Sequence, residues 1–370
     1  MKPNLIFVLL DGARWDRINI SKEFQDIVKE GTLLTNVTSA MPYTFGAMNV
    51  ILTGLYGKEN GVDGYYKVFG LKDSVEYLPE ILQKNGYYTS RGTIHEKVIS
   101  SRGFELNKIY DENADDPTKI NLELIEESFE NSNGKPIFCF FQYSPIHTVT
   151  VSDVLKKYEW DDEKFYLQQQ KNLEKYDDVF KEAGKHAKKI NEFIEKLDKK
   201  NETIIVFFTD HGTGMGERFG ERNYGSFTYE ETIRTFYLFL GIKIIENRKN
   251  DELLSTLSIC PTLLDLSGIK TNIKFSGKNL GPFLRGEEKS IEEKYTFSET
   301  GALHGIHPSP EKSNVFCIKT KKFKLIYFET SNKWELYNLE KDPKEKNNLV
   351  NTELNIEKIL KEKLLEYISR

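Results

Sequence analysis

Short runs of apolar residues alternate with segments of helical periodicity along this chain. The runs contain no charged residue and no regular polar alternation, and they lie at 5–10, 137–141, 204–208 and 236–240. Strands that are covered on both faces have this composition, whereas half-exposed strands alternate apolar and polar positions. Two helices are predicted in the first quarter of the chain, at 21–29 and from about 73 to 86. The pattern therefore predicts an α/β fold with a mainly parallel central sheet flanked by helices.

The remaining segments divide the chain into two parts. Residues 151–203 are charged and helical and are expected to cover the sheet, and the polar stretch 109–135 is expected to be a surface connection. After about residue 310 the pattern changes to predicted strands at 315–320, 323–328 and 334–339 and an amphipathic helix from 354. We therefore expect a catalytic domain at 1–310 and a small C-terminal α+β subdomain at 311–370, with an antiparallel sheet and a terminal helix.

Polar residues that suit a metal ion lie just after two of the apolar runs. Asp11 follows the first run, and Asp210 and His211 follow the third after one intervening residue, while Thr44 lies in a separate segment. In open α/β sheets, ligands bind outside the carboxyl ends of the strands. Two carboxylates, an imidazole and a hydroxyl suit a divalent cation that activates an alcohol, with Zn, Mn, Ca and Mg all left open.

Composition excludes several classes of protein. The 370 residues carry 52 basic and 57 acidic side chains, and no stretch combines Lys and Arg with interleaved aromatics, which argues against a nucleic-acid partner. The longest apolar run near the start has six residues, so neither a signal peptide nor a membrane span is expected and the chain is predicted to be cytoplasmic. An odd number of widely spaced cysteines gives no disulfide framework, and Cys139 and Cys317 are expected to be buried thiols.

A series of short motifs, in order along nearly the whole chain, resembles the sulfatase family of the alkaline phosphatase superfamily. They include Asn4–Asp11, Leu52-Thr53-Gly54, Arg102-Gly103-Phe104, Thr209-Asp210-His211-Gly212, Tyr229-Glu230-Glu231, Pro261–Gly268 and Glu335–Leu339. The resemblance implies the alkaline-phosphatase-like fold and assigns metal binding to Asp11, Asp210 and His211. It also places Thr44 at the position of the nucleophile.

This chain departs from the sulfatase pattern at the residues that handle the anion. Sulfatases carry a cysteine or serine that is oxidised to formylglycine where this chain has Thr44, and threonine cannot be converted by that route. An arginine of the family is replaced by Met48, and two lysines by Thr93 and Gly225. Much of the cationic surroundings of a bound sulfate is therefore expected to be absent.

Thr44-Phe45 is similar instead to the Thr-Phe of nucleotide pyrophosphatases/phosphodiesterases, which attack phosphorus with an unmodified threonine. Their oxyanion-stabilising Asn would be Ala47 here. His147 matches a family histidine that faces the substrate, and we expect it to protonate the leaving oxygen. His95 is retained from another motif and is expected to hydrogen-bond the transferred group.

The sequence leaves open whether a second metal ion binds. The two-metal phosphodiesterases use an additional Asp-x-x-x-His pair, for which Glu182 and His186 are a weak counterpart, and His304 or His307 would supply a later histidine. A solvated pair on a charged helix is the simpler interpretation of Glu182 and His186.

Four functions fit these residues. We favour a metal-dependent hydrolase that cleaves a small anionic phosphate or phosphonate ester through a covalent Thr44 intermediate. The alternatives are a sulfuric ester hydrolase without formylglycine, a phosphotransferase on the same scaffold, and a sulfatase-like protein without catalytic activity.

Overall fold

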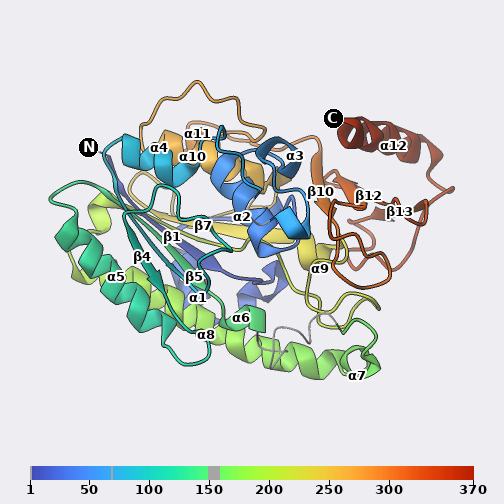
Figure 1. Cartoon of the computed structure of the whole chain (residues 1–370), viewed down its shortest axis with the longest axis horizontal. Coiled ribbons are helices and arrows are strands. Elements are labelled where there is room, and N and C mark those ends of the chain that lie inside the picture. The colour runs from blue at the N-terminus through green and yellow to red at the C-terminus, as the bar shows by residue number, and fades with distance from the viewer. Residues whose placement is uncertain (1, 68–69, 149–158) are drawn as a thin grey trace.

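A nine-stranded sheet forms the centre of the molecule (Figure 1). The structure, a computed structural model, describes residues 2–67, 70–148 and 159–370. The strands lie in the order β4 (Leu106–Ile109), β3 (Tyr88–Thr93), β5 (Ile137–Tyr143), β1 (Asn4–Leu10), β6 (Thr203–Phe208), β7 (Arg234–Gly241), β2 (Gly31–Thr38) and β8 (Arg248–Asn250), with β9 (Leu254–Ser255) paired to β2. The first five are parallel, and β7 runs antiparallel to both of its neighbours. The predicted mainly parallel sheet is thus confirmed.

Helices cover both faces of this sheet, as the apolar runs predict. Alternate residues of β1 enter two separate cores, Phe7 with one set of helices and Val8 with the other. The Phe7 side carries α2 (Thr44–Thr53), α4 (Leu78–Lys84), α10 (Ile259–Leu266) and α11 (Gly281–Leu284). The Val8 side carries α1 (Lys22–Val28), α5 (Pro117–Asn131) and α8 (Gln169–Lys196).

The C-terminal region forms a second, antiparallel sheet with a terminal helix. Its strands are β10 (Thr296–Thr300), β11 (Val315–Lys319), β12 (Phe323–Phe328) and β13 (Lys333–Asn338), followed by α12 (Leu354–Ser369). The three strands and the helix expected after residue 310 are present. Because β10 pairs with β11, this sheet begins at residue 296, before the boundary expected at 311.

The prediction of a surface connection at 109–135 is wrong, because α5 occupies most of this segment. Asp116 accepts hydrogen bonds from the backbone N–H groups of Thr118 and Lys119 and so caps the helix. Two of the residues on its buried face are Asn121 and Ser128. These polar residues dilute the apolar periodicity and explain why the pattern of the sequence does not predict the helix.

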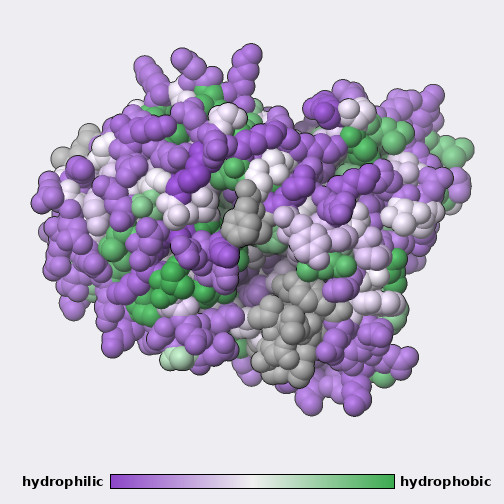
Figure 2. Space-filling model, viewed as in Figure 1, coloured by the Kyte–Doolittle hydropathy of each residue, from purple (hydrophilic) through white to green (hydrophobic). Residues whose placement is uncertain are grey.

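The face of the molecule shown in Figure 2 is largely polar. Among the described helices, none is both long enough and apolar enough to span a bilayer. Cys139, Cys260 and Cys317 are buried free thiols, which agrees with the expectation for the first and the last of them.

Candidate active site

The predicted metal ligands lie together at the carboxyl edge of the main sheet. Strands β1 and β6 are parallel neighbours, so Asp11 and the pair Asp210-His211 emerge side by side. All three side chains are buried, and their ligand atoms lie within 4.8 Å of one another. The chain bends after β6, so that both adjacent residues, Asp210 and His211, face the same site.

Thr44 completes this group from the opposite side. Its hydroxyl lies 3.2 Å from Nε2 of His211 and 3.3 Å from Oδ1 of Asp11. Thr44 is the first residue of α2, and the first intrahelical bond runs from the N–H of Ala47 to the carbonyl of Tyr43. The preceding N–H groups have no partner within the helix, and such helix N-termini favour anions. The nucleophile position therefore lies where an anionic group is stabilised.

The hydrogen bond on the far side of the His211 ring fixes its tautomer. Nδ1 lies 2.7 Å from the carbonyl oxygen of Gly212, which can only accept a hydrogen bond. Nδ1 therefore carries the proton in the neutral ring, and the lone pair of Nε2 points toward Thr44 and the two carboxylates. This is the arrangement that metal-binding histidines adopt.

The electrostatics of the two carboxylates also suit a cation. Burial, reinforced by repulsion from Asp210, raises the pKa of Asp11 to about 7. Burial likewise raises the pKa of Asp210 to about 7, and its Oδ2 atom is buried without a hydrogen-bond partner. A divalent cation would remove the repulsion and give Oδ2 a partner. Asp11, Asp210, His211 and Thr44 therefore fit a metal ion.

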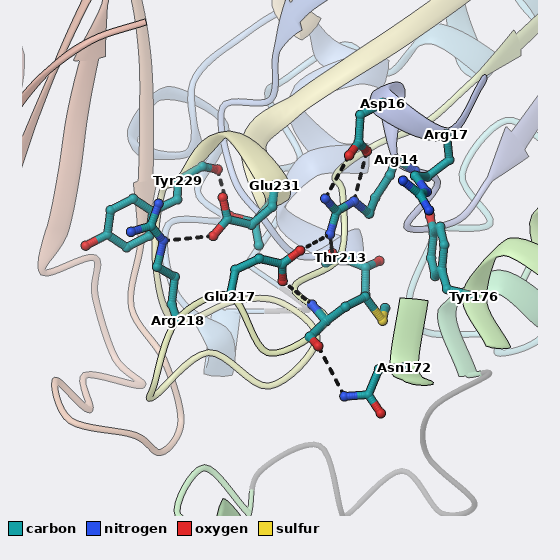
Figure 3. A network of polar contacts seen from close by, with 12 residues as sticks. Arg14, Asp16, Arg17, Asn172, Tyr176, Thr213, Glu217, Arg218, Tyr229 and Glu231 are labelled. Atoms are coloured by element: carbon teal, nitrogen blue, oxygen red, sulfur yellow. Dashed lines mark hydrogen bonds and ion pairs between the residues drawn. The ribbon is translucent and has the colours of Figure 1, made fainter. Parts of the chain in front are cut away.

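Arg14 joins the two turns that carry these ligands (Figure 3). Its guanidinium donates to the carbonyl of Thr213 at 3.1 Å and forms ion pairs with Glu217 and Asp16. Thr213 in turn donates to the carbonyl of Gly12, directly after Asp11, at 2.6 Å. The turn after β1 and the turn after β6 are thus fixed to each other beneath the metal ligands.

His147 lies beside the metal group, and Tyr224 connects the two. The Tyr224 ring packs against both imidazoles, with ring centroids 4.9 Å from His147 and 4.5 Å from His211, and its hydroxyl hydrogen-bonds Nε2 of His147. His95, by contrast, is exposed, and its Nδ1 accepts a hydrogen bond from the N–H of Lys97. The structure thus brings His147 to the site, while the role expected for His95 stays a prediction.

Neutral residues occupy the positions at which the resemblance to sulfatases implies cations. Met48 is buried in the core between α2 and the sheet. Gly225 has φ +99°, and a side chain there would overlap the hydroxyl of Tyr65. Thr93 donates a hydrogen bond of 2.6 Å to Oε1 of Gln142. None of the hydrogen bonds and ion pairs found for Asp11, Thr44 and Asp210 in the described residues involves Lys or Arg.

Three of the residues considered for a second metal make their contacts away from this group, whereas His304 lines a small pocket with Tyr224 and Gly225. His186 stacks on Tyr143 and hydrogen-bonds the hydroxyl of Thr118 through Nδ1, whereas Glu182 pairs with Lys185. His307 packs against Phe328, with ring centroids 5.2 Å apart. Within the described residues, Asp11, Asp210 and His211 form the one group of three such ligands.

Gln142 and Tyr224 are site residues that the sequence analysis did not identify. Gln142 directly follows the apolar run of β5, as Asp11 follows that of β1, and this position was an available signal. Tyr224 lies in a loop between His211 and α9 (Glu230–Ile233), and no local pattern marks it.

Solved structures of similar fold include a sulfatase and a phosphonate monoester hydrolase. A 2-O GAG sulfatase has a TM-score of 0.79 at 19% identity, covering 100% of this chain and 92% of its own. The phosphonate monoester hydrolase of Agrobacterium radiobacter has a TM-score of 0.79 at 16% identity, covering 100% and 96%. A third structure, in complex with D-glucosamine-2-N,6-O-disulfate, has a TM-score of 0.76 at 17% identity, covering 100% and 97%. At these identities the likeness shows the fold.

Fold and site together define an alkaline-phosphatase-like architecture with a buried group of possible metal ligands at the carboxyl edge of its sheet. Residues 3–269 match the family model for sulfatases, and residues 220–370 match the model for the C-terminal region of N-sulphoglucosamine sulphohydrolase. The chain belongs to the sulfatase family.

Curated relatives share shorter segments with this chain. The delta 4,5-hexuronate-2-O-sulfatase of Bacteroides thetaiotaomicron is 33% identical over 150 residues, which are 40% of this chain and 30% of that protein. The arylsulfatase of Clostridium perfringens is 32% identical over 164 residues, which are 43% and 32%. The alignments thus cover about a third of each relative.

Proposed function

We propose that the protein is a metal-dependent hydrolase of sulfuric esters that uses the hydroxyl of Thr44 as its nucleophile. The observation that carries this proposal is the position of that hydroxyl, within 3.3 Å of both Asp11 and His211, at the N-terminus of α2. Family membership favours sulfuric esters over the phosphate or phosphonate esters that the sequence alone suggests, because the curated relatives are sulfatases. Hydrolysis of a phosphorus ester is the second candidate, because Thr44 resembles the unmodified threonine with which nucleotide pyrophosphatases/phosphodiesterases attack phosphorus.

The charge of the site supports a substrate with one negative charge. Two carboxylates, a neutral imidazole and a divalent cation sum to zero, and the hydrogen bonds of the Thr44 hydroxyl among the described residues involve no lysine or arginine. A sulfuric monoester, a phosphodiester and a phosphonate monoester each carry one charge at pH 7, whereas a phosphate monoester carries between one and two. The missing cations therefore count against phosphate monoesters more than against sulfuric esters.

The reaction follows from the contacts of Thr44. A divalent cation bound by Asp11, Asp210 and His211 would supply Lewis-acid activation of the hydroxyl and neutralise developing charge. The oxygen of Thr44 forms a bond to sulfur as the bond from sulfur to the leaving oxygen breaks. The proton that Thr44 loses passes to a neighbouring carboxylate, and Oδ1 of Asp11 lies 3.3 Å from the hydroxyl. His147 donates a proton to the leaving oxygen.

Release of the covalent group differs from the formylglycine route. Threonine has no second hydroxyl on the attacking carbon, so water must attack the sulfur of the intermediate, restoring the Thr44 hydroxyl and freeing sulfate. The same two displacements apply to phosphorus. A phosphodiester or a phosphonate monoester is therefore the second candidate substrate, and the fold of the phosphonate monoester hydrolase agrees with it.

Four substrates with the same 4-nitrophenyl leaving group test this proposal: the sulfate, the phenylphosphonate, the phosphodiester and the phosphate monoester. We expect Mn²⁺-dependent turnover with the highest kcat/KM for the sulfate and the lowest for the phosphate monoester. A value for the phosphonate or diester more than about tenfold above that for the sulfate would establish the second candidate. Preference for the phosphate monoester would refute the charge argument, and no turnover of any ester would refute the assignment.

The natural substrate class can be approached in the same assay. One structural neighbour binds a sulfated glucosamine, so sulfated monosaccharides are the first natural esters to compare with the aryl sulfate. Added alcohols test for transfer in place of hydrolysis, because a transferase would yield a new ester rather than the free anion.

A further inference from the structure

A row of hydrogen bonds crosses the carboxyl edge of the sheet and ends on Asp11. Thr93 at the end of β3 donates to Oε1 of Gln142, the next-to-last residue of β5, at 2.6 Å. Nε2 of Gln142 donates to Oδ2 of Asp11 after β1, at 2.7 Å. Strands β3, β5 and β1 are consecutive and parallel. Gln142 pairs with Leu9, and Asp11 follows Leu9 by two residues, so the three side chains meet at the carboxyl edge of the sheet.

The neighbours of Gln142 fix the orientation of its amide. The N–H of Ile94 points at Oε1 from 3.5 Å, in addition to the hydroxyl of Thr93. A backbone N–H can only donate, so the amide atom facing it must be the oxygen. The NH₂ group therefore faces Asp11. The Gln142 backbone is also held, because the hydroxyl of Tyr110 hydrogen-bonds its carbonyl oxygen.

We propose that Thr93 and Gln142 are positioning residues that orient Asp11 for metal binding. This inference rests on the metal site of the proposed function. By occupying Oδ2, Gln142 fixes the rotation of the carboxylate and leaves Oδ1 directed at Thr44 and His211, 3.3 and 3.8 Å away. Thr93 acts through Gln142 by preventing the amide from turning its oxygen toward Asp11.

Burial makes this contact strong. Gln142 and Asp11 are each 1% exposed and Thr93 is fully buried, so water does not compete for their hydrogen bonds. The residues are also neutral apart from Asp11. Thr93 stands where the family has a lysine, so the position here orients a metal ligand through a neutral donor and brings no cation to the anion.

Binding of Mn²⁺ to the metal-free full-length protein tests the inference without any substrate. Outer hydrogen-bond partners of metal ligands typically contribute about 10- to 100-fold in affinity, so we expect Gln142→Met to raise the Kd by this factor. Thr93→Val keeps the shape but loses the hydroxyl, and should raise the Kd by about 3- to 10-fold, as expected for one neutral hydrogen bond. Thr93→Ser retains the donor and should stay within about twofold of the unaltered protein.

Ser90→Ala is the matched control. Ser90 is buried in the same strand as Thr93, and its hydroxyl bonds Ser128 at 2.7 Å, away from Asp11. It should lower the stability and leave the Kd within about twofold. A Kd for Gln142→Met within twofold of the unaltered value, or one no larger than that of Ser90→Ala, would overturn the inference, and Thr93→Val decides if Gln142→Met does not fold.

The two proposals fail in different ways. If the unaltered protein binds no Mn²⁺, the metal site itself is refuted, and the role of Gln142 with it. If the unaltered protein binds Mn²⁺ and the variants bind it equally well, only the positioning role is refuted. In the aryl ester assay, Thr93→Val should raise the Mn²⁺ concentration needed for half-activation and leave the KM for the ester within about twofold.

Discussion

The hydroxyl of Thr44 lies 3.2 Å from Nε2 of His211, although 167 residues separate the two in the chain. The contact places the hydroxyl among the metal ligands, where coordination would lower its pKa and align it for attack. Thr44→Ala should therefore reduce kcat for the aryl ester by at least about 10³-fold, since removal of a nucleophile costs this much or more in other hydrolases. Steady-state rates with saturating Mn²⁺ provide the measurement.

Two further variants separate chemistry from folding in this experiment. Thr44→Ser retains a hydroxyl and should keep kcat within about 100-fold. Thr53→Ala removes a buried hydroxyl at the other end of α2, which bonds the Asn49 carbonyl, and should leave kcat within a few-fold. Equal turnover of Thr44→Ala and the unaltered protein would refute the nucleophile.

Metal affinity should fall as the pH falls below about 7. Burial, with repulsion between the carboxylates, raises the pKa of Asp11 to about 7, and burial raises the pKa of Asp210 to about 7. Metal binding must displace the proton held there, so the Mn²⁺ Kd should rise by about tenfold per pH unit for each proton released. Calorimetry at pH 6 in buffers of different ionisation enthalpy counts these protons. Equal Mn²⁺ affinity at pH 5.5 and pH 8 would contradict the raised pKa values of Asp11 and Asp210.

The same carboxylates predict how the metal-free protein responds to pH. Their pKa values are higher in the folded than in the unfolded state, so their stabilising contribution is present below about pH 4 and is lost as the pH rises through about 7. Mn²⁺ binds the deprotonated carboxylates and offsets this loss of stability. The midpoint of urea unfolding should therefore shift upward on Mn²⁺ addition, and by more at pH 8 than at pH 6. A larger shift at pH 6 would give the opposite sign and contradict the prediction.

Arg14→Met should strongly destabilise the protein. The Arg14 and Glu217 side chains are only 8% and 14% exposed, so loss of the cation leaves a nearly buried carboxylate without its partner. Such a change typically costs about 3–5 kcal/mol, measured by urea unfolding. The double variant Arg14→Met/Glu217→Met should recover part of this loss.

An exposed ion pair provides the comparison for Arg14. Lys363 and Glu366 on α12 are each about half exposed, and Lys363→Ala should change the unfolding free energy by less than about 1 kcal/mol. Similar losses of unfolding free energy in Arg14→Met and Lys363→Ala would show that burial does not increase the cost of breaking the Arg14 ion pair.

His147→Asn should affect substrates according to their leaving group. If His147 protonates the leaving oxygen, its loss should reduce kcat/KM by about 10²- to 10⁴-fold for alkyl esters. Esters of 4-nitrophenol need little protonation and should lose less than about tenfold. The slope of log kcat/KM against leaving-group pKa, compared between the two proteins, measures the effect. An unchanged slope would assign His147 another role.

The residues that sequence patterns identify are those whose role is visible locally. Asp11 and Asp210 each follow an uninterrupted apolar strand, and the buried strands themselves are clear in the same way. The sequence pattern does not predict the helix α5 or the strand β10. Buried positions that the pattern assigns to apolar residues are filled by Asn121 and Ser128 in α5 and by Glu299 in β10. Tertiary contacts therefore decide these elements.

The position of Gln142 in the site depends on strand order. Its amide reaches Asp11 only because β5 pairs with β1, and nothing near residue 142 specifies that neighbour. Tyr224 reaches His147 and His211 through the path of a long loop. Both roles require contacts between distant segments, which a single sequence does not display.

The central position of β1 has a consequence for synthesis of the chain. All seven of its residues are buried, and its two neighbours, β5 and β6, follow it by more than 130 and almost 200 residues. At ribosomal rates of about 5–20 residues per second, this apolar strand waits roughly 10–40 s for its second partner. During that time it is a candidate for chaperone binding and for aggregation.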